Sequence, residues 1–237
     1  MTTYKIHPLV VGAREVDQGA MTYLANYGKR VWLPMYVFYL EGGDKTILVD
    51  TGLDEFMVPP EVGAKYGLDI LNFEPALATV GLKPGDIDVI VHTHLHDDHC
   101  ANDALCTRAK VYVQQAELEA MKSPHPIEYR YFPELLDGVD VVPLNGDAQI
   151  ADGLSVMLTP GHSPGGQSVV VNTTAGKAVI TGFCCNGENF PKSGGVICPG
   201  IHWSAVEAYN SALRVREVAD IILPLHDLSV GTKKTIP

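Results

Sequence analysis

Residues 93–99 read Thr-His-Leu-His-Asp-Asp-His and directly follow an apolar run that ends at Val91. The stretch places three histidines and two aspartates within seven positions. Imidazole and carboxylate are side chains that bind divalent ions such as zinc. A strand through His94 and His96 would point both to the same face, because side chains two positions apart in a strand do so. The motif therefore predicts a metal site at the end of a strand.

Asp98 and His99 are expected to lie beyond that strand, where they can aim at a second point close to the first. Aspartate-rich turns are often only solvated loops, and a lone histidine is usually a satisfied core or surface residue. The H-x-H-x-D-H spacing favours metal binding, because it has a geometric mechanism behind it. His92 shares the parity of His94 but lies one pleat earlier, so we expect a core or supporting histidine there.

Composition sets the class of protein. The chain has 237 residues, of which 46% are hydrophobic and 19% charged, and this predicts a single compact domain over residues 1–237. A formal net charge of -11 argues against nucleic acid or an anionic membrane as partner. No run of 18 apolar residues or N-terminal apolar signal appears. Five cysteines without C-x-x-C spacing indicate reduced thiols, and we therefore expect a cytoplasmic protein.

Local patterns predict strands and helices in both halves of the chain. Strands are expected at 4–11, 35–41, 45–50, 87–92, 110–113, 139–143, 154–158, 167–172, 177–181 and 221–225. Helices are expected at 73–82, 116–121 and 204–219, and an irregular lid at 123–136. This order predicts an α+β fold, an αββα sandwich in which two mixed β-sheets pack face to face with helices on the outer faces.

Two more histidines stand at predicted strand ends. His162 lies in the turn Thr159-Pro160-Gly161-His162-Ser163-Pro164-Gly165, whose prolines and glycines would hold the imidazole rigidly. His226 follows the apolar stretch 221–225. Neither signal identifies a metal site alone, and the turn around His162 is the stronger of the two.

Together these segments resemble the metallo-β-lactamase superfamily, most closely its N-acyl-homoserine lactonase branch. The resemblance runs over residues 33–228 and rests on Ile47-Leu48-Val49-Asp50-Thr51-Gly52, the H-x-H-x-D-H run, the 159–165 turn and His226-Asp227. It implies two sets of metal ligands, which are His94, His96 and His162 for the first ion and Asp98, His99 and His226 for the second. It also implies that Asp50 orients a ligand or nearby backbone through hydrogen bonds.

One position departs from the family. Superfamily members normally place a metal-bridging aspartate after the strand that here runs from Ala178 to Gly182, where this chain has Phe183. Cys184 is the next residue, and its thiolate would be a good zinc ligand. The alternative is that Cys184 is a buried apolar residue, which would leave the second ion weakly held or absent. The tyrosine that assists substrate binding in homoserine lactonases has no match, because Cys185 or Asn186 lies near that position.

The predicted function is a metal-dependent hydrolase that uses a metal-bound hydroxide to open a lactone or a related cyclic ester or amide. A divalent ion lowers the pKa of coordinated water from 15.7 to about 7, so hydroxide is available at neutral pH. Asp98 is expected to bind metal or to pass a proton to the leaving oxygen. We expect one or two Zn²⁺ ions, with Mn²⁺ or Fe²⁺ as alternatives, a small-molecule substrate, and a homodimer by family resemblance.

Two other functions stay open. A mononuclear iron oxidoreductase of the persulfide dioxygenase type would share His94 and His162 but requires the missing aspartate. A non-catalytic metal-binding module would explain that loss but not the retained ligands. Iron content with oxygen consumption would indicate the first alternative, and failure to bind metal tightly would favour the second.

Overall fold

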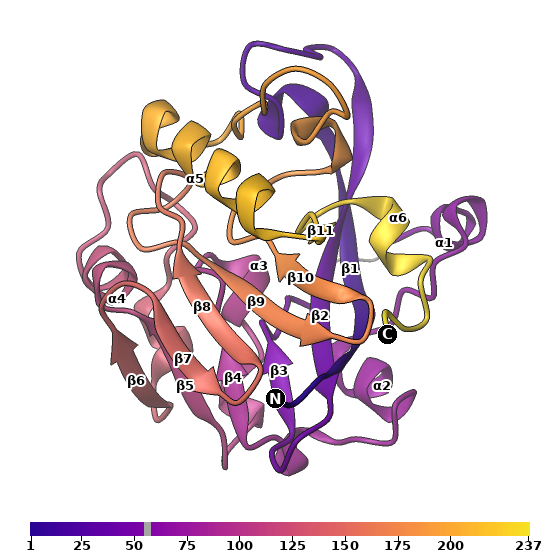
Figure 1. The fold of residues 1–237 in the computed structure, drawn as a ribbon, viewed down its shortest axis with the longest axis vertical. Coiled ribbons are helices and arrows are strands. Elements are labelled where there is room, and N and C mark those ends of the chain that lie inside the picture. The colour runs from indigo at the N-terminus through magenta and orange to yellow at the C-terminus, as the bar shows by residue number, and fades with distance from the viewer. Residues whose placement is uncertain (55–57) are drawn as a thin grey trace.

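The computed structural model describes residues 1–54 and 58–237, and its strands form two mixed sheets that face each other (Figure 1). The first sheet has the order β1 (Lys5–Asp17), β2 (Arg30–Glu41), β3 (Ile47–Val49), β4 (Val89–Val91), β5 (Lys110–Gln114) and β6 (Asp140–Leu144). The second has the order β11 (Ile221–Leu223), β10 (Gly176–Ile180), β9 (Gln167–Thr173), β8 (Leu154–Leu158) and β7 (Ala148–Ala151). Strands β3 to β6 are parallel to one another, as are β10 and β11.

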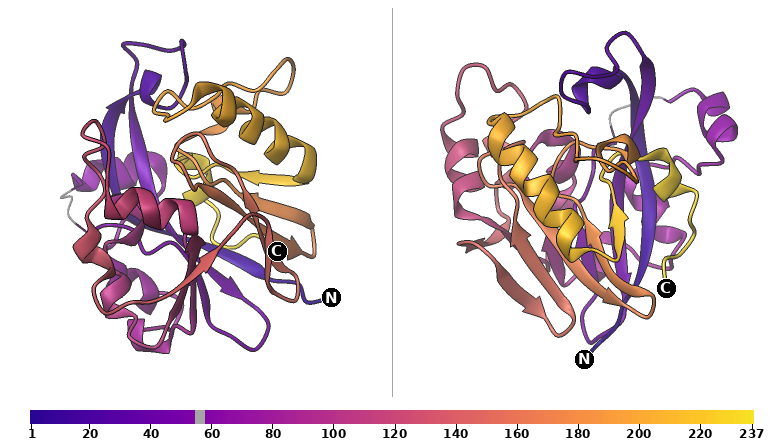
Figure 2. Two further views of the ribbon diagram at one scale, coloured as in Figure 1. Left: turned by 90° about the vertical axis from the view of Figure 1, so that its left-hand side faces the viewer. Right: turned by 45° about the horizontal axis from the view of Figure 1, so that its top comes forward.

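Helices lie on the outer faces of this pair of sheets. The α-helices are α1 (Pro60–Tyr66), α2 (Phe73–Ala78), α3 (Asp97–Cys100), α4 (Gln115–Lys122), α5 (Ala205–Val218) and α6 (Leu228–Gly231). Short 3₁₀ helices are η1 (Gln18–Ala20), η2 (Pro84–Asp86), η3 (Asp103–Leu105), η4 (Pro133–Leu136) and η5 (Gly187–Asn189). Helices α2 and α4 contact the first sheet and α5 contacts β10, and Figure 2 shows the resulting layers in profile. The predicted αββα sandwich is confirmed.

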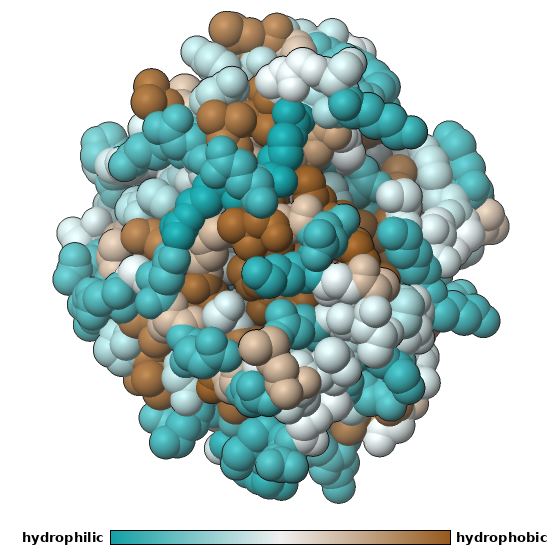
Figure 3. All heavy atoms as spheres, viewed as in Figure 1, coloured by the Kyte–Doolittle hydropathy of each residue, from teal (hydrophilic) through white to brown (hydrophobic). Residues whose placement is uncertain are grey.

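Apolar side chains fill the space between the sheets. Phe38 and Val91 of the first sheet belong to one buried cluster with Val169 and Ile180 of the second. Separate clusters lie under α2 and under α5, so each sheet buries both of its faces. The face shown in Figure 3 is mostly hydrophilic, with hydrophobic residues gathered near its middle. No helix of the described residues is long and apolar enough to span a membrane.

The expected strands are present, but several local predictions need correction. The first two strands continue into a long hairpin to Asp17 and Arg30. The helix predicted over 73–82 ends at Ala78, because the chain turns there and Gly81 adopts a φ of 77°. Strand β7 and helix α1 were not predicted.

The strand carrying the metal motif also ends earlier than predicted. Strand β4 stops at Val91, so the prediction that one strand carries both His94 and His96 is wrong. The backbone N–H of His92 still donates to Tyr112 of β5, but that of Thr93 donates to the carboxylate of Asp50. The two histidines therefore sit in a loop between β4 and α3.

Candidate metal centre

Six side chains converge where the loops after β4, β8 and β11 meet. One group, here called the first triad, consists of His94, His96 and His162, and the second triad consists of Asp98, His99 and His226. Within each triad, the potential ligand atoms all lie within 4.8 Å of one another. The triads adjoin, since the rings of His94 and His99 have centroids 4.2 Å apart. All six side chains are buried. The structure thus brings together both predicted ligand sets.

The turn between β8 and β9 directs His162 toward the first triad. The His162 Nδ1–H donates to the carbonyl of Ile201 at 2.8 Å, which leaves Nε2 facing His94 and His96. Gly161 makes this turn compatible with the start of α5, because a Cβ there would lie 2.1 Å from the backbone nitrogen of Ala208. Glycine is therefore required at a contact that fixes the histidine beside it.

The second triad combines a short helix with a strand end. Asp98 and His99 lie in α3, and His226 follows β11. The His226 Nδ1–H donates to the carbonyl of Pro34 at 2.8 Å, and the backbone N–H of His226 donates to the carbonyl of Cys185 at 3.0 Å. His226 is thus held from both sides, its imidazole by Pro34 and its backbone by Cys185.

Asp50 supports the ligand loop from the end of β3. Because β3 and β4 are parallel and adjacent, their carboxyl ends meet and place Asp50 beside Thr93. The Asp50 carboxylate accepts hydrogen bonds from the Thr93 backbone N–H at 2.8 Å, the Thr93 hydroxyl at 2.7 Å and the His99 Nδ1–H at 2.8 Å. Burial opposes its ionisation, but the neighbouring His99 and His92 outweigh burial and lower the pKa of Asp50 to about 2. Asp50 occupies the left-handed region with a φ of 59°.

His92 links Asp50 to a second buried aspartate. Its Nδ1 lies 3.3 Å from Asp50 and its Nε2 lies 2.7 Å from Asp103, which also accepts a bond from the Thr51 hydroxyl. Burial opposes protonation of His92, but Asp103 and Asp50 outweigh it and raise the pKa of His92 to about 10. His92 is therefore a fully buried supporting histidine, as its position in the sequence predicts.

Glu117, at the start of α4, is a buried carboxylate that the sequence analysis missed. It accepts hydrogen bonds from the Leu95 N–H at 3.1 Å, the Gly165 N–H at 2.8 Å and the Tyr131 hydroxyl at 2.6 Å. Leu95 lies between two histidines of the first triad, and Gly165 lies in the turn that carries the third. Glu117 thus ties both ligand loops together. The sequence gives only a faint signal for this role, because a glutamate in the first turn of a helix is common.

The six side chains fit a divalent metal ion. The Nε2 atoms of His94, His96, His99 and His162 are buried and make no hydrogen bond with any residue that the structure describes. A buried ring nitrogen without a partner is costly unless a ligand satisfies it. Burial, reinforced by neighbouring cationic groups, lowers the pKa of His94, His96 and His162, and that of His226 to about 4. Their imidazoles are neutral, the form that binds metals.

Asp98 supplies the only carboxylate of the two triads. Burial opposes its ionisation, but Arg130, His99 and His226 outweigh burial and hold the pKa of Asp98 well below its usual range. The Arg130 guanidinium lies 3.2 Å from Asp98 Oδ1, while Oδ2 lies 3.7 Å from His99 Nε2. Asp98 is therefore an ionised carboxylate, with Oδ1 toward Arg130 and Oδ2 toward His99.

Residues 183–185, which follow β10, are apolar and buried. Phe183 is fully buried in the cluster under α5 and lies near Phe190. The Cys184 sulfur belongs to neither triad, although Arg130 and Asp98 both influence its ionisation. Burial raises the pKa of Cys184 to about 12, which makes it a neutral thiol in the metal-free protein. Cys184 stays a predicted ligand, apart from the six residues of the triads.

A cavity of about 560 Å³ opens beside His96. Its lining includes Glu128, whose carboxylate lies 3.4 Å from His96 Nε2, and Tyr131, whose ring centroid lies 5.0 Å from that of His96. Trp203 and His125 form its outer rim and contact each other edge to face. The cavity therefore lies next to the candidate centre, and a small organic molecule could contact its apolar side chains.

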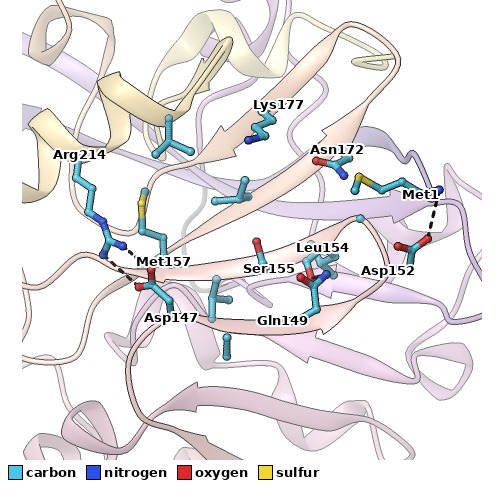
Figure 4. Close-up of a pocket in the computed structure, with 15 residues that line it drawn as sticks. Met1, Asp147, Gln149, Asp152, Leu154, Ser155, Met157, Asn172, Lys177 and Arg214 are labelled. Atoms are coloured by element: carbon cyan, nitrogen blue, oxygen red, sulfur yellow. Dashed lines mark hydrogen bonds and ion pairs between the residues drawn. The ribbon is translucent and has the colours of Figure 1, made fainter.

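A larger cavity of about 840 Å³ lies elsewhere, on the outer side of the second sheet (Figure 4). Lys177 and Arg214 line it together with Asp147 and Asp152, and Arg214 pairs with Asp147 at the surface. No residue of either triad lines either cavity, but Glu128 and Tyr131 of the smaller cavity contact His96. Size alone therefore does not identify the functional pocket.

Comparisons with known proteins agree with this geometry. A family model described as the metallo-beta-lactamase superfamily matches residues 30–217. An N-acyl homoserine lactonase from Bacillus sp is 30% identical over 232 residues, which cover 92% of this chain and 89% of the relative. The Bacillus cereus N-acyl homoserine lactonase is 30% identical over 193 residues, covering 76% and 75% of the two chains. The structure of an N-acyl homoserine lactone hydrolase, with the product N-hexanoyl-L-homoserine bound at its catalytic metal center, superposes with a TM-score of 0.78. The two chains are 27% identical, and the match covers 97% of this chain and 95% of that one.

Proposed function

Because the chain belongs to the metallo-beta-lactamase superfamily, we propose that it is a metal-dependent hydrolase that opens a lactone ring. The observation that carries the proposal is the convergence of His94, His96 and His162 as buried, neutral imidazoles whose Nε2 atoms have no hydrogen-bond partner among the described residues. The lactonase relatives and the structural similarity to a product-bound lactone hydrolase support the choice of substrate class.

The proposed ligands are the six residues of the triads. His94, His96 and His162 would hold one ion, and Asp98, His99 and His226 would hold a second where one binds. Zinc suits the histidine-rich donor set, and manganese or iron(II) could also bind there. When bound, the ion supplies a Lewis acid for the carbonyl group and lowers the pKa of water, so that water attacks at neutral pH.

The protein's own groups would position the substrate and move the proton. The cavity beside His96 would hold the organic part of the substrate against Tyr131 and Trp203. Asp98 is ionised and buried, so it can accept a proton from the attacking water. It can then deliver that proton to the ring oxygen that leaves as an alcohol. Hydrolysis of the ester needs no covalent intermediate with the enzyme.

We also propose that residues 1–237 act as one domain. Residues of both sheets share one buried cluster, and the second triad draws His226 from the end of the chain and Asp98 from its middle. Neither sheet would provide a complete centre by itself.

Metal analysis combined with a lactone and ester panel tests the proposal. The metal-depleted protein should lose hydrolysis of lactones and recover it with Zn²⁺ or Mn²⁺. His96→Ala should bind less metal and fall to background activity, because it removes a ligand of the first triad. His125→Ala, on the rim of the cavity, is the matched control and should keep its metal. Full hydrolysis by the metal-depleted protein would exclude the proposed function, and iron-dependent oxygen consumption would favour an oxidoreductase instead.

A further inference from the structure

Arg130 is a buried cation inside the candidate centre. Its side chain is 11% exposed and projects from the segment between α4 and η4. The backbone on both sides is fixed, because the Arg130 carbonyl accepts from the Asp97 N–H at 3.0 Å and the Arg130 N–H donates to the Glu128 carboxylate at 3.0 Å. An arginine does not lose its proton in proteins, so this is a permanent positive charge.

The guanidinium touches one member of each triad. Arg130 Nη2 lies 2.5 Å from His96 Nδ1 and 3.2 Å from Asp98 Oδ1. Glu128 faces the other ring nitrogen of His96 at 3.4 Å, so Nδ1 is the nitrogen on the Asp98 side. Arg130 Nε is buried and has no hydrogen-bond partner among the described residues. The guanidinium therefore lies between the two triads, and one of its buried N–H groups has no hydrogen-bond acceptor among the described residues.

Arg130 and a metal ion compete for this space through their charges. The Nε2 atom of His96 is left free for an ion, whereas Arg130 occupies Nδ1 of the same ring and Oδ1 of Asp98. Two cations a few ångströms apart also repel strongly in a buried site. The triads have little negative charge to offset this repulsion, since Asp98 is their only carboxylate and Phe183, which follows β10, does not add another.

We propose that Arg130 is an internal cation that competes with divalent ions for the space between the triads. Resting on the metal binding proposed above, this inference makes Arg130 a positioning residue whose charge opposes an ion held by the triads. It holds Asp98 in the metal-free protein and weakens occupancy of the centre. The wild-type chain should then bind one ion tightly, and a second ion should bind tightly only when the arginine charge is removed.

Titration of Zn²⁺ into the metal-depleted proteins, in competition with a chromophoric chelator, tests the proposal. Arg130→Gln should bind Zn²⁺ about tenfold more tightly than the wild type, with stoichiometry rising toward two, because it lacks the competing charge. Arg130→Lys keeps the charge and should bind like the wild type. Arg214→Gln removes a surface arginine and is the matched control.

Thermal unfolding of the same variants separates competition from a purely structural role. Metal-free Arg130→Gln should unfold at a lower temperature, because Asp98 is left buried without its partner. Added Zn²⁺ should raise its unfolding temperature by more than it raises that of the wild type. If the wild type binds Zn²⁺ and Arg130→Gln binds it no more tightly, the inference is wrong but the proposed function stands. If no variant binds metal, both the inference and the proposed function fail.

Discussion

The two sheets support their ligands in different ways. At the ends of β3 and β4, His99 is held by the buried carboxylate of Asp50, which also binds Thr93 and His92. On the side of the second sheet, His162 and His226 are held by backbone carbonyls. A carboxylate is a charged group that a single substitution can remove, whereas a backbone carbonyl is not. The first-sheet side should therefore be the more sensitive to mutation, and the second-sheet side the more tolerant.

The strongest test of this difference is Asp50→Ala. It leaves His99 buried without its carboxylate and His92 with Asp103 alone, and we expect the free energy of unfolding to fall by about 3–5 kcal/mol. Metal affinity should fall up to about 100-fold, because His99 loses its orienting partner. Urea unfolding and metal titration measure the two effects. Asp140→Ala, at an exposed position of β6, should change neither. If Asp50→Ala is as stable as the wild type, the first-sheet side is not the more sensitive one.

Glu117→Gln probes the carboxylate that joins the two sides. The amide keeps the size of the side chain but replaces one acceptor oxygen and the charge, so we expect a loss of about 1–3 kcal/mol. Metal affinity should fall about tenfold, because the loops carrying His94 and His162 lose a shared anchor. Glu119→Gln, exposed on the same helix, is the control. Equal effects of the two substitutions would show that Glu117 does not tie the loops.

The pH dependence of the metal-free protein sharpens the comparison further. The Asp103 and Asp50 carboxylates raise the pKa of His92 to about 10, from about 6.5 in an unfolded chain. Its stabilising contribution is thus fully present below about pH 6.5 and is lost as the pH rises through about 10. We expect the wild type to lose about 1–2 kcal/mol more than His92→Gln between pH 7 and pH 10. Chemical unfolding at each pH measures this, and parallel curves for both proteins would contradict it.

Cys184→Ala should have the smallest effect. Its thiol is neutral and its sulfur belongs to neither triad, so we expect a change below about 1 kcal/mol in stability and less than threefold in metal affinity. The cobalt-substituted protein provides a second measurement, because a thiolate ligand gives a charge-transfer band in the near ultraviolet. A tenfold loss of affinity together with loss of that band would instead establish Cys184 as a ligand, which is one of the two alternatives that the sequence leaves open.

The sequence was informative where chemistry depends on short spacing. The H-x-H-x-D-H run and the turn around His162 identify their residues by type and position, and the structure brings those residues together. The local conformation was less predictable, since β4 ends before His94 once Asp50 captures the Thr93 backbone. Glu117 and Arg130 could not be predicted, because they reach the centre only through the packing of α4 and the following segment.

The contact between His226 and Pro34 joins positions 192 residues apart. During synthesis, the chain would expose the H-x-H-x-D-H loop long before the residue that completes the second triad emerges. A fully assembled centre therefore reports that the last strand has docked beside β10. An ion bound by residues from both sheets would hold the sheets together. The metal content of a sample would then measure the fraction of molecules that have finished folding.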